Sequence, residues 1–305
     1  MIKKNRILVT GVNGYVGSHI FNYFAKKSDY VVEGIDIIEK ASDSRIHIVD
    51  LRKANTTKIF FRDNKFDFIY HTAGIIEGQN ISEYINGNVT TTLNLLDSLK
   101  EDKDVRIFIF GTASQYSNKY VRLVKETDKT LPVNNYGLSK KLQEFAAKHY
   151  LENYFLDLIF LRIFNIYGEG QSNNFVIPKF IDKVISCKKD NSNIKDINID
   201  FHRDFIYVDD LVKILELLLN SAVKGEIYNI GSGTPTSINS VLKKISEFSG
   251  QDLEIFYEKA EYRETDIPYQ VADISKLKST IGEYKFTNFD EKLKNLYFKS
   301  SNSDQ

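Results

Sequence analysis

The most informative feature of this sequence for its fold is a glycine-rich loop between a short apolar run and a helical pattern. The run 7–10 has the composition of a buried strand, and Thr10-Gly11-Val12-Asn13-Gly14-Tyr15-Val16-Gly17 leads directly into a predicted helix over 18–27. Glycines at these spacings permit a tight turn, let the backbone approach a pyrophosphate and pack the helix against the sheet. The helix N-terminus adds amide donors and a positive dipole end. The pattern therefore predicts a dinucleotide site, with cofactor contacts from Gly11, Asn13, Gly14, Tyr15, Val16 and Gly17.

Short runs rich in Ile, Val and Phe alternate with helical patterns through the first half of the chain. This alternation indicates βαβ units and a parallel sheet buried on both faces. The expected fold class is α/β, a doubly wound parallel (Rossmann) sheet with a smaller C-terminal substrate lobe. We place the dinucleotide-binding domain at 1–165 and the substrate lobe at 166–300, with about 200–222 returning to the first domain. The predicted strands are 7–10, 30–35, 45–49, 66–71, 106–110 and 156–163, and the predicted helices are 18–27, 88–99, 135–150, 175–187, 209–220 and 237–248.

An acidic residue ends the second predicted strand. Asp36 stands where a carboxylate accepts hydrogen bonds from both ribose hydroxyls of an adenosine. The same charge repels a 2′-phosphate, and the following residues 37–40 contain no arginine. NAD(H) is therefore the favoured cofactor, and NADP(H) remains possible.

Composition narrows the class of protein further. Lys plus Arg and Asp plus Glu are 41 each, so no overall field attracts nucleic acid or an anionic membrane surface. The single cysteine, Cys187, allows no internal disulfide and fits a reducing compartment, so we expect a cytoplasmic protein. The five histidines lack metal-ligand spacing, and we expect no metal.

A tyrosine and a lysine lie four residues apart at a predicted helix start. Asn134 and Asn135 are candidate caps for this helix, and the spacing puts Tyr136 and Lys140 on one face, one turn apart. A nearby ammonium stabilises a phenolate and should lower the pKa of the tyrosine, making an acid/base pair. Thr112 leaves the end of the preceding strand, at the edge where open α/β sheets bind ligands.

With the glycine loop, Thr112 and Tyr136-Gly137-Leu138-Ser139-Lys140 in this order, the chain resembles the extended short-chain dehydrogenase/reductases that act on nucleotide sugars. The resemblance implies that Thr112 hydrogen-bonds the reacting oxygen, that Tyr136 is the acid/base, and that Lys140 holds the nicotinamide ribose. It also implies a homodimer. Further cofactor contacts are expected from Asp50 and Leu51 at the adenine end, from His71 and Ala73 after the fourth strand, and from Tyr136 and Lys140.

Three segments of the second half resemble the family's substrate side. Asn165, within Arg162-Ile-Phe-Asn-Ile-Tyr-Gly, corresponds to an asparagine that touches the sugar nucleotide. Arg203, within Arg-Asp-Phe-Ile-Tyr-Val-Asp-Asp, and Arg263, within Arg-Glu-Thr-Asp, correspond to two arginines. Guanidinium groups bind diphosphate oxygens through paired donors, so both arginines are expected at the substrate diphosphate.

The resemblance leaves the reaction type open among a few alternatives. Family members that eliminate water carry an Asp-Glu pair after the catalytic Thr, and here Ala113 and Ser114 occupy those positions. The segments 164–177 and 198–205 resemble reductases of GDP- or dTDP-linked 4-keto-6-deoxyhexoses. We therefore expect an NAD(P)H-dependent C4 reductase serving surface polysaccharide biosynthesis. A nucleotide-sugar 4-epimerase with tightly bound NAD is the alternative, and a non-catalytic NAD(H)-sensing module is a more distant one.

Overall fold

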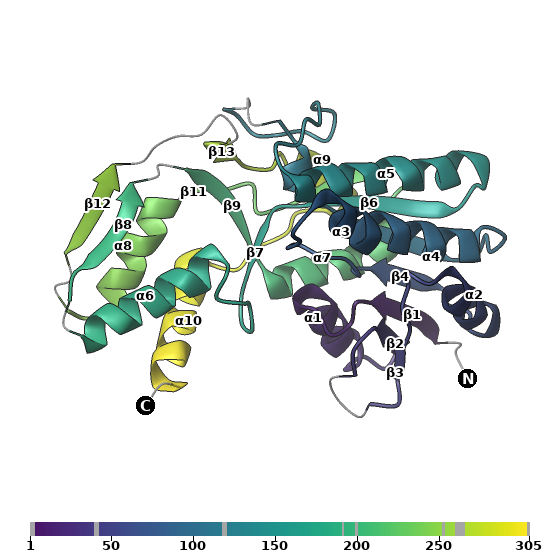
Figure 1. Cartoon of the computed structure of the whole chain (residues 1–305), viewed down its shortest axis with the longest axis horizontal. Helices are drawn as coiled ribbons and strands as arrows, with labels where there is room; N and C mark the ends of the chain where they lie inside the picture. The colour runs from purple at the N-terminus through teal and green to yellow at the C-terminus, as the bar shows by residue number, and fades with distance from the viewer. Residues whose placement is uncertain are drawn as a thin grey trace.

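The chain forms a large lobe around a parallel sheet and a smaller lobe beside it (Figure 1). A computed structural model describes residues 4–39, 43–117, 121–190, 192–198, 201–251, 254–259 and 266–303. In the part described, no helix combines the length and apolarity that crossing a membrane requires.

Seven strands of the described chain form the sheet of the large lobe, and every neighbouring pair is parallel. The strand order is β10-β6-β5-β4-β1-β2-β3, so β1 and β4 lie in the middle. This order brings the ends of β1, β4 and β5 together at one edge. The strands are β1 (Asn5–Thr10), β2 (Tyr30–Asp36), β3 (Ile46–Ile48), β4 (Phe68–His71), β5 (Arg106–Thr112), β6 (Asp157–Ile163) and β10 (Ile227–Ile230).

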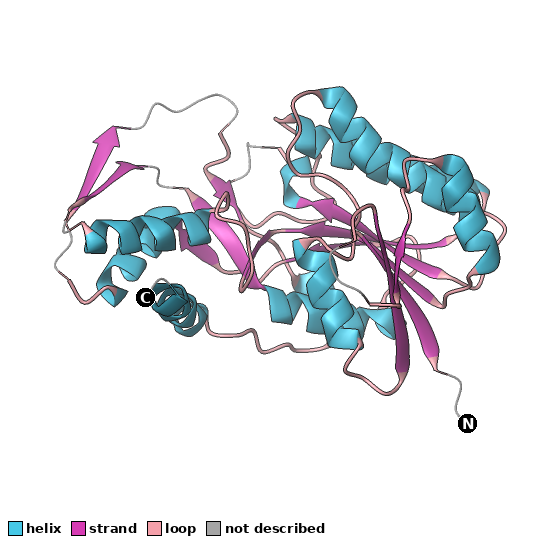
Figure 2. Cartoon of the chain, turned by 60° about the horizontal axis from the view of Figure 1, so that its bottom comes forward, coloured by secondary structure: helices cyan, strands magenta, loops and turns pink. Residues whose placement is uncertain are grey.

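Successive apolar residues of each strand point to opposite faces, and both faces are covered by helices. In β1, Ile7 and Val9 join the core on one side, whereas Leu8 joins the core on the other. The first face is covered by α1 (Tyr15–Phe24), α7 (Val208–Ser221) and α9 (Ser275–Ile281). The second face is covered by α2 (Ala54–Asp63), α4 (Thr91–Leu99) and α5 (Asn135–Asn153) (Figures 1 and 2).

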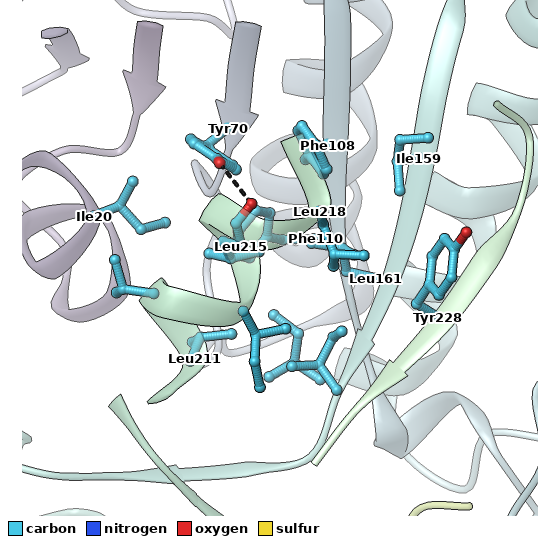
Figure 3. Close-up of a cluster of buried hydrophobic side chains, with 14 of the residues drawn as sticks. Ile20, Tyr70, Phe108, Phe110, Ile159, Leu161, Leu211, Leu215, Leu218 and Tyr228 are labelled. Atoms are coloured by element: carbon cyan, nitrogen blue, oxygen red, sulfur yellow. Dashed lines mark hydrogen bonds between the residues drawn. The ribbon is translucent and has the colours of Figure 1, made fainter. Parts of the chain in front are cut away.

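Helix α7 carries much of the core on the first face. Leu211, Leu215 and Leu218 are fully buried and lie against aromatic side chains of the sheet (Figure 3). The hydroxyl of Tyr70 donates a hydrogen bond to the carbonyl of Leu215 at 3.0 Å, so the polar tip of this buried ring is satisfied. Burial of such side chains stabilises the sheet by about 1.5–3 kcal/mol each.

The smaller lobe has a core of its own, built from amphipathic helices. Its apolar cluster joins α6 (Val176–Lys189), α8 (Ile238–Phe248) and α10 (Phe289–Ser303). Strands β8 (Ile194–Asn198) and β12 (Ile255–Lys259) pair in parallel beside these helices. A second small sheet joins β7 (Asn165–Tyr167), β9 (His202–Tyr207), β11 (Pro235–Ser237) and β13 (Tyr269–Gln270).

The structure confirms the predicted fold class and adds details that the sequence did not indicate. Helix α2 was not predicted. The helix expected over 88–99 begins as α-helix only at Thr91, after α3 (Ile81–Tyr84) and a π-helical turn, η1 (Ile85–Thr90), which includes residues 88–90. The seventh strand, β10, comes from a segment after the predicted return of about 200–222. The division into domains at 165 and 166 stays a prediction.

Candidate active site

The glycine loop forms a backbone cradle at the end of β1. Gly11 has a φ of +65°, and a Cβ on it would lie 2.8 Å from the Cα of Ala73. A Cβ on Gly17 would lie 2.2 Å from the carbonyl oxygen of Gly11. Both contacts are with backbone that cannot move aside, so side chains are excluded where the loop turns into α1. Tyr15 and Val16 follow in the first turn of α1.

A cleft of about 340 Å³ opens beside this cradle. Asp36 lies in its wall, where its carboxylate accepts hydrogen bonds from the backbone N–H groups of Asn13 at 2.9 Å and of Ile37 at 2.7 Å. These bonds hold the carboxylate beside the glycine loop. Of the predicted cofactor residues, the cleft is lined by Gly11, Asn13, Gly14, Asp36, Asp50, Leu51 and Ala73.

Replacing Asp36 by Ala should weaken NAD(H) binding and improve NADP(H) binding relative to it. The substitution removes the acceptor for the ribose hydroxyls and the repulsion toward a 2′-phosphate. Fluorescence titration with NADH and NADPH measures both affinities. If their ratio stays unchanged, Asp36 does not face the adenosine ribose.

The part of the cleft where an adenine contact was predicted holds an ion pair. Arg52 donates to both carboxylate oxygens of Asp50, at 2.8 and 3.0 Å, and these hydrogen bonds lower the pKa of Asp50. His71, by contrast, does not line the cleft. It is fully buried behind the Ala73 segment, between the hydroxyls of Thr10 and Thr92 at 2.9 and 2.8 Å. His71 therefore supports the cleft wall from behind, and its direct contact with the cofactor stays a prediction.

Thr112 ends β5 and caps the short 3-10 helix η2 (Ala113–Gln115). Its hydroxyl accepts from the N–H of Ser114, and the Gln115 side chain accepts from the N–H of Thr112 at 3.0 Å. Asn134 caps α5, as predicted. A Cβ on Gly137 would lie 2.2 Å from the Ser114 carbonyl oxygen, so the first turn of α5 packs directly on this loop.

This packing places the Tyr136 phenol beside Thr112. Burial raises the pKa of Tyr136 to about 12, and the Thr112 hydroxyl, through a hydrogen bond, only partly opposes that shift. The expectation of a lowered pKa was therefore wrong for this structure, because desolvation of the phenol outweighs the hydrogen bond from Thr112. The phenol is a protonated acid at neutral pH.

Lys140 lies one turn along α5 and is 5% exposed. Its ammonium donates to the carbonyl of Phe110 and to the side-chain oxygen of Gln143, both at 2.8 Å. It also lies beside Gly74, where a Cβ would be 3.5 Å from the ammonium nitrogen. Gly74 lines the cleft, so the ammonium lies behind this part of the cleft wall. Burial lowers the pKa of Lys140 to about 7.

A buried ion pair, which the sequence did not single out, connects α5 to the segment 112–115, the predicted catalytic loop. Arg162 on β6 donates to both oxygens of Glu144, at 3.0 and 2.8 Å, and the two side chains are 5% and 9% exposed. Gln115 donates to the same carboxylate at 2.9 Å while accepting from the N–H of Thr112. The position of Glu144, four residues beyond Lys140, was the available signal for a further residue on this helix.

Glu144 should make the free energy of unfolding depend on pH. Burial by itself would raise its pKa, but the hydrogen bonds and charge of Arg162, helped by Lys148, lower it from 4.5 to about 2. The folded chain thus favours the ionised carboxylate, and this stabilisation is present above about pH 4.5 and lost as the pH falls toward 2. Urea unfolding of wild type and Glu144→Gln between pH 7 and pH 3 should give a stability difference that shrinks with acidity. A constant difference would contradict the assignment.

The predicted substrate residues Asn165 and Arg203 lie on the small sheet of β7 and β9. The amide of Asn165 donates to the Asp204 carbonyl at 3.3 Å. Arg203 donates to the carbonyls of His202 and Ile267, and burial lowers its pKa to about 10. Arg263 lies outside the described residues.

This small sheet also contacts the catalytic loop. Gln270 on β13 pairs with Arg203 in the sheet. Its side chain donates to the carbonyl of Ala113 at 3.0 Å, next to Thr112. The structure therefore brings the segment of Arg203 close to the loop of Thr112.

Comparisons with known proteins show the family of this chain. The model of the NAD-dependent epimerase/dehydratase family matches residues 7–231. A GDP-6-deoxy-D-talose 4-dehydrogenase from Aggregatibacter actinomycetemcomitans is 30% identical over 297 residues, covering 96% of this chain and 97% of the relative. A putative UDP-glucose 4-epimerase from Methanocaldococcus jannaschii is 33% identical, covering 90% and 91%. Among solved structures, a UDP-N-acetylglucosamine 4-epimerase from Methanobrevibacter ruminantium aligns with a TM-score of 0.83 at 27% identity, covering 98% and 99%.

The chain belongs to the NAD-dependent epimerase/dehydratase family. It is an NAD-dependent enzyme that modifies nucleotide sugars. The residues present fit the cofactor. The glycine loop has no side chains where a pyrophosphate would approach the backbone, and Asp36 lines the same cleft. Gly11, Gly14 and Gly17 would hold the pyrophosphate, Asp36 the adenosine ribose, and Lys140 the nicotinamide ribose.

Proposed function

We propose that this enzyme reduces the C4 keto group of a nucleotide-linked 4-keto-6-deoxyhexose, with GDP as the favoured nucleotide and dTDP as the other candidate. The observation that carries the proposal is the similarity to GDP-6-deoxy-D-talose 4-dehydrogenase over nearly the whole of both chains. A 4-dehydrogenase running in reverse is a 4-keto reductase, because oxidation and reduction at one carbon share a transition state.

The residues of the site supply the groups that the reduction needs. NADH, when bound, supplies the hydride. Tyr136 gives its phenolic proton to the C4 oxygen as that oxygen gains charge, and Thr112 orients the same oxygen by a hydrogen bond. A pKa of about 12 keeps the Tyr136 proton in place at neutral pH, as an acid requires. Ala113 and Ser114, which follow Thr112, offer no carboxylate for proton removal at neighbouring carbons, so a dehydratase is disfavoured.

We further propose that Asn165, Arg203 and Arg263 bind the sugar nucleotide. Arg203 uses one terminal nitrogen for the two carbonyls that hold it. A guanidinium has five N–H donors, which leaves donors for phosphate oxygens. Because the Arg203 guanidinium is desolvated, its attraction to a diphosphate is stronger than in water.

The proposal is tested by incubating the purified enzyme and NADH with GDP-, dTDP-, CDP- and UDP-linked 4-keto-6-deoxyhexoses. Mass spectrometry should find that one of them, most efficiently the GDP-linked sugar, gains two hydrogen atoms. Reduction of the CDP- or UDP-linked sugar alone would contradict the assigned nucleotide. Absence of reduction with all four would contradict the reaction.

A nucleotide-sugar 4-epimerase is the second candidate, favoured by the similarity to the putative UDP-glucose 4-epimerase at 33% identity. An epimerase returns hydride to the same carbon, so it interconverts two C4 epimers without net use of cofactor. Incubation with UDP-glucose and catalytic NAD distinguishes the two, because the reductase leaves this sugar unchanged.

We also propose that the enzyme is a homodimer held through α5. Leu138, Leu142 and Phe145 lie four and three residues apart, which puts them on one helix face. They are 37%, 37% and 75% exposed, an apolar stripe that a second copy would cover. Light scattering after gel filtration should show a dimer, and Phe145→Glu should give a monomer. A monomeric wild type would contradict the proposal.

A further inference from the structure

The ammonium of Lys140 is the end of a buried hydrogen-bonded chain that crosses the large lobe. It donates to Gln143, whose amide donates to the Thr92 hydroxyl at 2.9 Å. The ring of His71 joins Thr92 to Thr10, and the Thr10 hydroxyl accepts from the backbone N–H of Ala73 at 3.0 Å. Gln143, Thr92, His71 and Thr10 are all fully buried.

When Lys140 is protonated, its ammonium sets the direction of every bond in this hydrogen-bonded chain. An ammonium only donates, so the Gln143 oxygen must face Lys140 and its nitrogen must face Thr92. The Thr92 hydroxyl donates to the carbonyl of Asn88 at 2.8 Å, so it must accept from the Nε2–H of His71.

The remaining ring nitrogen of His71, Nδ1, therefore accepts from the Thr10 hydroxyl. This assignment makes His71 a neutral ring. Its pKa of about 3, lowered by burial and by Lys140, agrees with that state.

The same geometry limits what Lys140 can reach. An ammonium has three N–H bonds. The carbonyl of Phe110 and the side chain of Gln143 take two of them, both at 2.8 Å. Two fixed acceptors set the direction of the third N–H, and the ammonium lies next to Gly74, a residue of the cleft wall.

Resting on the proposed function, we propose that Gln143 is a positioning residue that aims the Lys140 ammonium at the cofactor. Thr92 holds the Gln143 amide in turn, and His71 and Thr10 connect it to the Ala73 backbone of the cleft wall. These hydrogen bonds thereby connect the lysine to the glycine loop, because Thr10 directly precedes Gly11. No sugar contact is involved.

Fluorescence titration with NADH tests this role. Gln143→Met keeps the size of the side chain but removes the acceptor for the ammonium, and NADH should bind about tenfold more weakly or worse, as for a lost hydrogen bond to a charged group. Gln143→Glu restores an acceptor and should recover most of the affinity. Tyr228→Phe is the matched control, because it also removes a hydrogen bond, the partly buried one that the Tyr228 hydroxyl accepts from the Val223 N–H, on β10 at the edge of the sheet. It should leave the affinity unchanged.

A double-mutant cycle separates positioning from packing. In a Lys140→Met background, Gln143→Met should cause little further loss of NADH affinity, because the group that Gln143 positions is already absent. Additive losses, or normal affinity in Gln143→Met, would overturn the proposal. These titrations use no sugar, so they remain decisive even if the assigned reductase reaction fails.

Discussion

Replacing Tyr136 by Phe should reduce turnover by about a hundredfold or more while NADH binding changes little. The substitution removes the phenolic proton and leaves the ring to pack, and a general acid contributes about 10² to 10⁴ in rate. Single-turnover kinetics with the reducible nucleotide sugar measures the loss at the chemical step, and NADH titration measures the affinity.

Tyr150→Phe is the matched control, because it makes the same chemical change further along α5. It should retain full turnover. Near-normal turnover in Tyr136→Phe would remove this tyrosine from the mechanism, and an equal loss in both variants would indicate damage to the helix.

Replacing Arg162 by Met should destabilise the fold by about 3–5 kcal/mol, the cost of leaving a buried carboxylate without its partner. The free energy of unfolding in urea measures this loss. Such a change is a large part of the stability of a typical domain, about 5–15 kcal/mol. The double variant Glu144→Gln/Arg162→Met should recover part of the loss, because the buried group is then neutral.

The control for this prediction is Arg62→Met, which breaks the exposed Arg62–Asp63 pair on α2 and should cause no measurable loss. The catalytic loop adds a second readout. Because Gln115 joins Glu144 to the N–H of Thr112, Arg162→Met should also lower turnover at temperatures where the variant is folded. A stability loss equal to that of Arg62→Met would contradict the role of the buried pair.

The sequence was informative wherever local patterns carry the structure. Runs of Ile, Val and Phe predicted the strands of the sheet because a sheet buried on both faces needs continuous apolar segments. The glycine loop was predicted because its backbone contacts exclude side chains, and the start of α5 because Asn134 has the chemistry of a helix cap.

Most of the features that the sequence did not reveal depend on contacts between distant segments. Helix α2 has only ten residues, and only Thr57, Phe60 and Phe61 of them are buried, so few apolar residues mark it. The role of Gln143 requires Thr92, which is 51 residues away. The pKa of Tyr136 could not be foreseen either, because spacing alone shows the nearby lysine but not the burial of the ring.

The central claim, that this enzyme is a reductase, is tested most directly by the stoichiometry of cofactor use. Purified enzyme is mixed with excess NADH and a limiting amount of GDP-linked 4-keto-6-deoxyhexose. The amount of NADH oxidised and the amount of sugar reduced are then both measured. We expect one NADH oxidised per sugar reduced, with no interconversion of sugar epimers that lack the keto group. Interconversion of such epimers with catalytic cofactor and no net oxidation would contradict the reductase and show an epimerase.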